Sequence, residues 1–263
     1  LRWTEQEFII PAGRVKNFRW TADRQPFAAL LLKTMDAERY PRIVILGCTQ
    51  SGKTQTGFVI PTLYHLFEIR EDVICGLPDM DMASDKWNKA LRPAIEASPY
   101  KHLLPDTGAG SRGGKVDTIK FKHGCTLKFM SGGGSDKSRA GFESRVVIIT
   151  ETDGLDSAGE GSREADKIKQ LEARTYSHGD RKQIYMECTV STEEGRTWAE
   201  YGKSTKSRLA CRCPHCRHYV TLEREHFTGH ETATNIEEAR ERGRFHCCDC
   251  WEEWSEADRL AAN

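Results

Sequence analysis

The sequence predicts an α/β fold in which a mostly parallel sheet is covered by helices on both faces, followed by a small cysteine-rich module. An apolar run at residues 43–46 leads directly into a glycine-rich loop, strand-like and helical segments then alternate, and two Cys-x-x-Cys pairs lie near the end. With 263 residues, the chain is long enough to bury a sizeable core.

The glycine-rich loop, residues 47–54, matches the pattern G-x-x-x-x-G-K-[ST] at every fixed position, and we refer to it as the glycine loop. A strand that ends in such a loop and continues as a helix directs backbone N–H groups toward a polyphosphate. Lys53 would reach the β- and γ-phosphates of ATP, and the Thr54 hydroxyl would bind Mg²⁺. The alternative is a turn that matches by chance, and the flanking strand and helix disfavour it. The candidate nucleotide-binding residues are Gly47, Gln50, Ser51, Gly52, Lys53 and Thr54.

Composition limits the classes of function. The chain has 39 basic and 39 acidic residues, and this balance argues against a protein that coats nucleic acid through bulk electrostatics. The sequence contains neither a signal-peptide pattern nor an apolar run of about eighteen residues. We therefore expect no membrane partner and an intracellular location.

The segment before the glycine loop has two predicted parts. Residues 1–19 are expected to form an extended arm. Residues 28–37 have helical composition, with Thr21 or Asp23 as the cap and Pro26 in the first turn. The Gln25 amide can both donate to and accept from an adenine edge, but an exposed residue at a helix start would look the same.

Predicted strands and helices continue to alternate after the glycine loop. The pattern predicts a helix over residues 55–69 that Pro61 kinks or divides, a buried strand over 72–77 and a helix over 82–97. Residues 118–122 and 126–130 read as a β-hairpin. Its lysines either track phosphates or form a solvated strand face.

The strand-like run Arg145–Ile149 ends at Thr150, Glu151, Thr152 and Asp153. We expect this strand to lie beside the glycine loop, with Glu151 as the general base that polarises water toward the γ-phosphate; a surface carboxylate is the alternative. Thr150 stands where an Asp usually helps to hold Mg²⁺, and Asp153 is close enough in sequence to substitute. Arg139 would neutralise charge on the transferring phosphoryl group or form a salt bridge in its loop.

The next segments complete the predicted sheet. Residues 154–161 are expected to form a polar loop, and residues 163–175 a charged helix. A last core strand at 183–188 opens onto Thr189–Thr192, whose hydroxyls either contact the γ-phosphate region or are ordinary residues at a strand end.

The two Cys-x-x-Cys pairs are thirty residues apart and supply the four thiolates of a closed, structural Zn²⁺ site. Four thiolates leave no open coordination position, so catalysis by this zinc is not expected. Cys211, Cys248, His215 and His246 are spare donors that could replace one ligand. An insertion with a helix at residues 236–242 is expected between the pairs. The predicted ligands are Cys213, Cys216, Cys247 and Cys250.

The order of these features resembles the large terminase subunit of tailed bacteriophages, most closely its lambda-type branch. The glycine loop, residues 145–153, the Ser/Thr strand tip and the first cysteine pair carry the resemblance, which spans residues 21–250. It implies a P-loop NTPase of the ASCE type that hydrolyses ATP to package double-stranded viral DNA into a procapsid. By the same resemblance Gln25 belongs to an adenine-binding segment, Glu151 to Walker B, Arg139 to an arginine-finger region and Thr189 to a coupling motif.

The resemblance also implies partners, a location in the cell, and an activity that is not expected. The portal protein, the small terminase subunit and further copies in a ring are expected partners, and the host cytoplasm is the expected location. The expected division is an arm (1–19), an ATPase domain (20–205), a zinc-ribbon-like module (206–254) and a tail or linker start (255–263). The family's nuclease half has no room here, so DNA cleavage is not expected. A helicase-type ATPase and a non-hydrolysing, zinc-stabilised scaffold are the alternatives.

Overall fold

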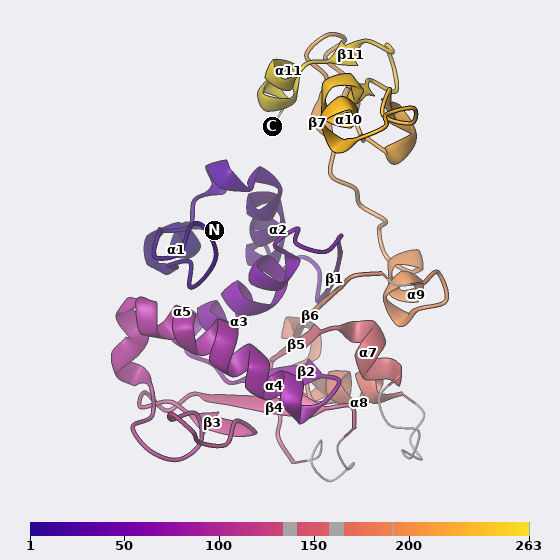
Figure 1. Cartoon of the computed structure of the whole chain (residues 1–263). Helices are drawn as coiled ribbons and strands as arrows, with labels where there is room; N and C mark the ends of the chain where they lie inside the picture. The colour runs from indigo at the N-terminus through magenta and orange to yellow at the C-terminus, as the bar shows by residue number, and fades with distance from the viewer. Residues whose placement is uncertain (134–140, 158–165, 191, 263) are drawn as a thin grey trace. The chain divides into compact units, whose positions relative to one another are not determined.

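The computed structural model describes residues 1–133, 141–157, 166–190 and 192–262 (Figure 1). The chain divides into two compact units, Leu1–Thr205 and Lys206–Asn263, which are described separately. Among the described residues, no helix has both the length and the apolar character needed to cross a membrane.

Within the described residues, the first unit is built on a six-stranded sheet in the order β1-β6-β5-β2-β4-β3. The first five of these run parallel, and only β3 is antiparallel, to β4, so the predicted mostly parallel sheet and the predicted hairpin are confirmed. The strands are β1 (Arg42–Leu46), β2 (Val73–Leu77), β3 (Thr118–Lys120), β4 (Thr126–Ser131), β5 (Val146–Thr150) and β6 (Gln183–Cys188).

The order of the strands corrects one expectation. β5 does not lie beside β1, because β6 pairs with both of them and separates them. β2, β5 and β6 are buried along their whole length, as expected for central strands of a sheet that is covered on both faces.

The helices that precede β3 form one group of elements. They are α1 (Arg2–Glu7), η1 (Ala22–Arg24), α2 (Pro26–Asp36), the π-helical η2 (Gln55–Val59), α3 (Ile60–Leu63), the π-helical η3 (Tyr64–Ile69), α4 (Met80–Lys86), the π-helical η4 (Trp87–Leu91), α5 (Arg92–Ala97) and η5 (Pro99–Leu103). Buried side chains from α2, α3 and α5 pack with Cys75, Ile148 and Tyr185 of the sheet in one apolar cluster.

The helices that follow β5 cover the other face. They are α7 (Thr152–Ser157), α8 (Lys167–Ala173), η6 (Tyr176–Arg181) and α9 (Arg196–Gly202). Leu155 of α7 and Leu171 of α8 pack against Ile74, Val147 and Met186. The helical runs that leave β1 and β5 therefore depart to opposite faces, an arrangement that places ligand sites at the carboxyl edge of a parallel sheet.

Three local predictions differ from the structure, and one further segment departs from a regular α-helix. Residues 1–19 are not an extended arm, because α1 forms there and Trp3 and Phe8 enter the core. The N-cap of α2 is Gln25 rather than Thr21 or Asp23. The helical run after the glycine loop contains Pro61 in the short α-helix α3, with a π-helical segment on each side of it. The expected polar loop begins as helix α7, because Leu155 is buried under the sheet.

The second unit is a small fold around the cysteines. Cys213, Val220, Cys247 and Trp254 form its buried centre. The expected tail contains a capped helix, and the helix predicted at residues 236–242 is present. Its elements are β7 (Cys211–Arg212), β8 (Tyr219–Val220), η7 (Arg224–His226), β9 (Phe227–Thr228), α10 (Ile236–Arg242), β10 (Arg244–His246), β11 (Glu253–Trp254) and α11 (Glu256–Ala261).

Candidate functional site

The glycine loop connects the carboxyl end of β1 to a helical run that begins at Lys53. The loop is closed by contacts to the carbonyl of Cys48, which accepts hydrogen bonds from Ser51 Oγ at 2.8 Å and from Lys53 Nζ at 3.3 Å. Lys53 is 9% exposed, so its ammonium group is held inside the curve of the loop. This is the position from which a lysine can reach bound phosphates.

The backbone conformation at position 52 and a neighbouring side chain both favour a glycine there. Its φ of 80° lies in the left-handed region, where a side chain adds strain. A Cβ at Gly52 would also lie 2.8 Å from the Gln25 amide nitrogen. The structure therefore places Gln25 against the glycine loop itself, which brings together two residues that the sequence separates by α2 and β1.

Glu151 follows β5 directly and lies at the same carboxyl edge. Its φ of 54° is unusual for a glutamate, and its N–H donates to the Glu187 carbonyl at 3.0 Å. Lys86 Nζ of α4 lies 4.0 Å from the Glu151 carboxylate, whose side chain is 37% exposed. Backbone strain of this kind clusters at functional sites, and here it turns the Glu151 side chain out of the strand.

Thr189 follows β6, the strand next to β1. Leu46 is paired with Cys188, so Thr189 comes level with the start of the glycine loop. Thr189, Glu151 and the loop are thus the continuations of three neighbouring strands at one edge.

One other predicted residue, Asp153, is not brought to this group. The Asp153 carboxylate accepts hydrogen bonds from the Thr197 N–H and hydroxyl at 2.7 and 2.6 Å, so it caps the start of α9 rather than facing the glycine loop. Arg139 lies outside the described residues.

Glu187 of β6 is a candidate site residue that the sequence analysis did not identify. Its side chain is completely buried, and its Oε1 accepts a hydrogen bond from the Thr150 hydroxyl. The register places it opposite Thr150 on one side and Ile45 on the other. A Cβ at Gly57 would lie 3.2 Å from Glu187 Cβ, so the carboxyl side chain points toward the helical run that begins at Lys53.

The surroundings of Glu187 disfavour the charged form of its carboxyl group. Burial raises its pKa, while the hydroxyls of Thr150 and Thr54 and the charge of Lys86 lower it only in part. Its Oε2 is buried without a hydrogen-bond partner. A carboxylate oxygen without a partner beside the Thr54 hydroxyl is a donor set that suits Mg²⁺, so the described residues fit this ion.

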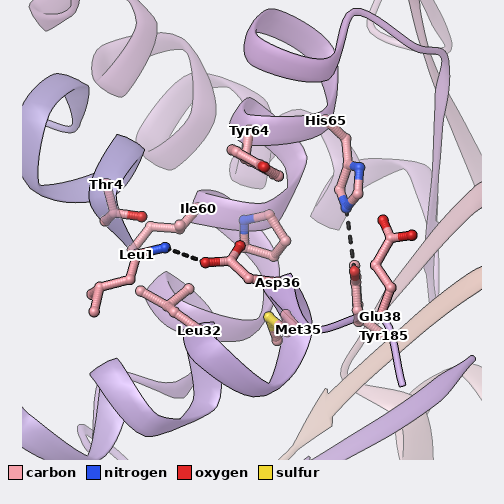
Figure 2. A pocket seen from close by; sticks show the side chains of 11 residues that line it. Leu1, Thr4, Leu32, Met35, Asp36, Glu38, Ile60, Tyr64, His65 and Tyr185 are labelled. Atoms are coloured by element: carbon pink, nitrogen blue, oxygen red, sulfur yellow. Dashed lines mark hydrogen bonds and ion pairs between the residues drawn. The ribbon is translucent and has the colours of Figure 1, made fainter. Parts of the chain in front are cut away.

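A separate small cavity of about 40 Å³ lies between α2, α3 and the body of β6. Figure 2 shows Asp36 and His65 at this cavity, with the His65 ring directed toward the Tyr185 hydroxyl. Its lining includes no residue of the glycine loop, and its volume is too small for a nucleotide. We therefore assign the candidate site to the carboxyl edge of the sheet.

The four predicted zinc ligands converge in the second unit. Their sulfur atoms all lie within 4.8 Å of one another, and the pairs Cys213–Cys250 and Cys216–Cys247 are 3.9 and 3.8 Å apart. A tetrahedral zinc with Zn–S bonds of about 2.3 Å separates its sulfurs by about 3.8 Å. Among the described residues, the spare donors Cys211, Cys248, His215 and His246 do not join this cluster.

Both cysteine pairs occupy the same kind of turn. Cys213 donates its N–H to the His218 carbonyl and accepts from the Arg217 N–H, while Cys247 makes the same two contacts with Glu252 and Trp251. Each turn places the residue after its second cysteine at a positive φ, 68° at Arg217 and 60° at Trp251. The backbone geometry is therefore repeated at the two halves of the cluster.

The mostly parallel sheet, with helices on both faces and the glycine loop at its carboxyl edge, defines the class of protein as an α/β domain. The model of the family described as "Phage terminase large subunit gpA, ATPase domain" matches residues 15–263, so the chain belongs to this family. The resemblance that the sequence motifs indicated is confirmed.

The solved structures support the same fold. The crystal structure of the HK97 bacteriophage large terminase is similar with a TM-score of 0.58 and 15% sequence identity. The likeness covers 78% of this chain and 40% of that chain, so the present chain spans less than half of that protein. A comparison with the curated proteins found no match.

Proposed function

We propose that this chain hydrolyses ATP at the carboxyl edge of its sheet and that the hydrolysis moves double-stranded DNA into a procapsid. One observation carries the proposal: the glycine loop after β1 and Glu151 after β5 lie at the same edge of a terminase-type ATPase sheet. A phosphate-binding loop and a carboxylate at one edge are the parts that water attack on a γ-phosphate requires.

Each residue then has a role that follows from its position. The loop N–H groups and Lys53 bind the phosphates, and the Gln25 amide packs against Gly52 at the entrance to the loop. Glu151 orients the attacking water and accepts its proton. Thr54 and Glu187 would hold Mg²⁺, which supplies charge neutralisation on the phosphates when it is bound. Arg139 and Thr189 remain proposals as a second cation and a γ-phosphate contact.

The wider assembly rests on family membership. We propose double-stranded DNA, the portal protein, the small terminase subunit and further copies of the chain in a ring as the partners, and the host cytoplasm as the place of action. A packaging motor must couple nucleotide turnover to movement of its substrate, so ATP hydrolysis is the first property to measure.

Steady-state ATP hydrolysis tests the proposal. We expect Glu151→Gln to lower kcat by about 10²- to 10⁴-fold, because the water loses its base. Nucleotide binding should persist in this variant, whereas Lys53→Ala should lose it. The matched control is Glu143→Gln, an exposed glutamate that precedes the amino end of the same strand and should leave the rate unchanged.

The outcomes separate the candidate functions. A Glu151→Gln variant as fast as the wild type would contradict the assigned base. Nucleotide binding by the wild type without turnover would favour a non-hydrolysing scaffold. Turnover that double-stranded DNA stimulates, in the presence of portal protein and procapsids, would support the motor.

We also propose that the four-cysteine cluster binds one structural Zn²⁺. The proposal is supported by sulfur spacings that match a tetrahedral site and by the repeated turn geometry of the two cysteine pairs. A site closed by four thiolates stabilises a small fold that has few buried apolar side chains.

Metal analysis of the purified chain tests the zinc site. We expect about one zinc per chain, lost when Cys213 and Cys250 are both changed to Ser. The matched control is the double change of Cys211 and Cys248 to Ser, two cysteines of the same unit that lie outside the cluster. Equal zinc content in both double variants would contradict the assigned ligands.

A further inference from the structure

Glu187 occupies a position where a buried carboxylate needs a partner. It is completely buried, yet one of its two oxygens has no hydrogen-bond partner and the other accepts a hydrogen bond from the neutral Thr150 hydroxyl. An unpaired buried charge is unfavourable, so such a group either holds a proton or receives a cation.

The nearby cations of the protein are already engaged elsewhere. Among the described residues, no Lys or Arg nitrogen lies within 4.0 Å of the Glu187 carboxylate. Lys86, whose charge acts on the Glu187 carboxyl, pairs with Glu151 at 4.0 Å and lies over the Phe58 ring. Arg42, at the other end of β1, is paired with Glu172 and Glu200. The missing partner is therefore better supplied from outside the chain.

The position of Glu187 identifies that partner. It faces the first turns of the helical run that carries Thr54, the predicted Mg²⁺ ligand, and it is paired in register with Thr150. Thr150 stands where an Asp would usually serve the metal. A glutamate is one methylene longer than an aspartate, and β6 lies one strand nearer to β1 than β5 does. A carboxylate that is absent from β5 is thus present on the neighbouring strand.

We propose that Glu187 supplies the carboxylate for the Mg²⁺ of the bound nucleotide, in place of the Asp that position 150 lacks, with the Thr150 hydroxyl as a positioning residue. The proposal rests on the proposed function, because it concerns the metal of the same nucleotide site. Thr150 donates its proton to Glu187 Oε1 and so leaves Oε2 available to the ion or to one of its waters. Asp153, the substitute that the sequence suggested, is engaged with Thr197 instead.

Nucleotide affinity with and without metal tests this assignment apart from turnover. Calorimetric titrations with a non-hydrolysable ATP analogue, AMP-PNP, are made in excess Mg²⁺ and in EDTA. For Glu187→Gln we expect the affinity gain from Mg²⁺ to fall by about 10- to 100-fold, with the EDTA affinity unchanged. Titration of Mn²⁺ into the AMP-PNP complex, followed by electron spin resonance of free Mn²⁺, should show the same loss.

A rescue variant and a control make the result specific. Thr150→Asp combined with Glu187→Gln returns a carboxylate to the end of β5 and should recover most of the metal-dependent affinity. Glu143→Gln, outside the site, should behave as the wild type in both titrations. Recovery by the double variant would also show that the effect of Glu187→Gln is not misfolding.

The negative outcomes are distinguishable. A Glu187→Gln variant that keeps the full Mg²⁺ gain, in a wild-type background that hydrolyses ATP, would overturn this inference alone. An equal loss of affinity in Mg²⁺ and in EDTA would assign Glu187 a structural role and also overturn it. A wild-type chain that binds no nucleotide under either condition would refute the proposed function instead.

Discussion

Glu71, which is half-buried, and Glu187, which is completely buried, lie at opposite edges of one sheet, and their surroundings differ sharply. Glu71 precedes β2 and receives two hydrogen bonds from Arg145 at 2.8 Å, while His65 Nδ1 lies 2.7 Å from it. Glu187, near the carboxyl edge, has hydroxyl partners and one oxygen without any. One carboxylate is fully satisfied by the fold, and the other is not.

The pKa values follow these surroundings. Burial would raise the pKa of Glu71, but the hydrogen bonds and charges of Arg145 and His65 hold it at about 2. Burial dominates at Glu187 and raises its pKa. The fold pairs the carboxylate at one edge of the sheet and leaves an oxygen of the other unpaired at the edge where parallel sheets bind ligands. The first belongs to a structural ion-pair network, and the second to the candidate functional site.

The structural network extends beyond Glu71. Arg145 also contacts Glu38 and the Arg181 carbonyl, so it joins the segments that enter β1, β2, β5 and β6. His65 links the same network to the Tyr185 hydroxyl at 3.3 Å, the contact drawn in Figure 2. These contacts fix the amino edge of the sheet and thereby the register of the strands that carry the site.

The largest expected contrast is in stability. Glu71→Gln should lower the free energy of unfolding at pH 7 by about 3 kcal/mol, because Arg145 loses its bidentate partner. Glu187→Gln should lower it by less than about 1 kcal/mol or raise it, because a poorly satisfied buried carboxyl is removed. Urea unfolding followed by far-UV circular dichroism measures both, with Glu143→Gln as the control. Equal losses in the two variants would show that Glu187 is a structural carboxylate like Glu71.

The same contrast explains how far the sequence could predict the site. Local spacing alone singled out Glu151 and the residues of the glycine loop as candidates, and they lie at one edge of the sheet. The cysteine pairs were found for the same reason, and their sulfurs converge. Glu187 was not proposed from the sequence, because its location beside Thr150 and the glycine loop depends on β6 lying between β1 and β5. No local sequence pattern encodes this strand order.

The wrong predictions for residues 1–19 and for the loop at residues 154–161 have a related cause. Trp3 in the expected arm and Leu155 in the expected loop are isolated apolar residues among polar ones, and Phe8 begins an apolar run of only three residues, so the local sequence pattern is weak. Each is buried by contacts with distant elements. Tertiary packing therefore determined the structure where the local sequence pattern was weak. The strongly apolar run predicted as a strand at residues 145–149, by contrast, forms β5 at Val146–Thr150.

A smaller effect should appear in acid and would sharpen the contrast further. The folded pKa of Glu71 lies below its unfolded value, so its charge stabilises the fold above about pH 4.5, and this contribution is lost as the pH falls toward about 2. With allowance for screening, since about a fifth of the side chain is exposed, the loss should be about 2 kcal/mol. The difference in unfolding free energy between the wild type and Glu71→Gln should therefore shrink by this amount when urea unfolding is repeated from pH 7 downward. A difference that stays constant over this range would mean that Glu71 is not held ionised by Arg145 and His65, and the distinction between the two edges of the sheet would then lose its electrostatic basis.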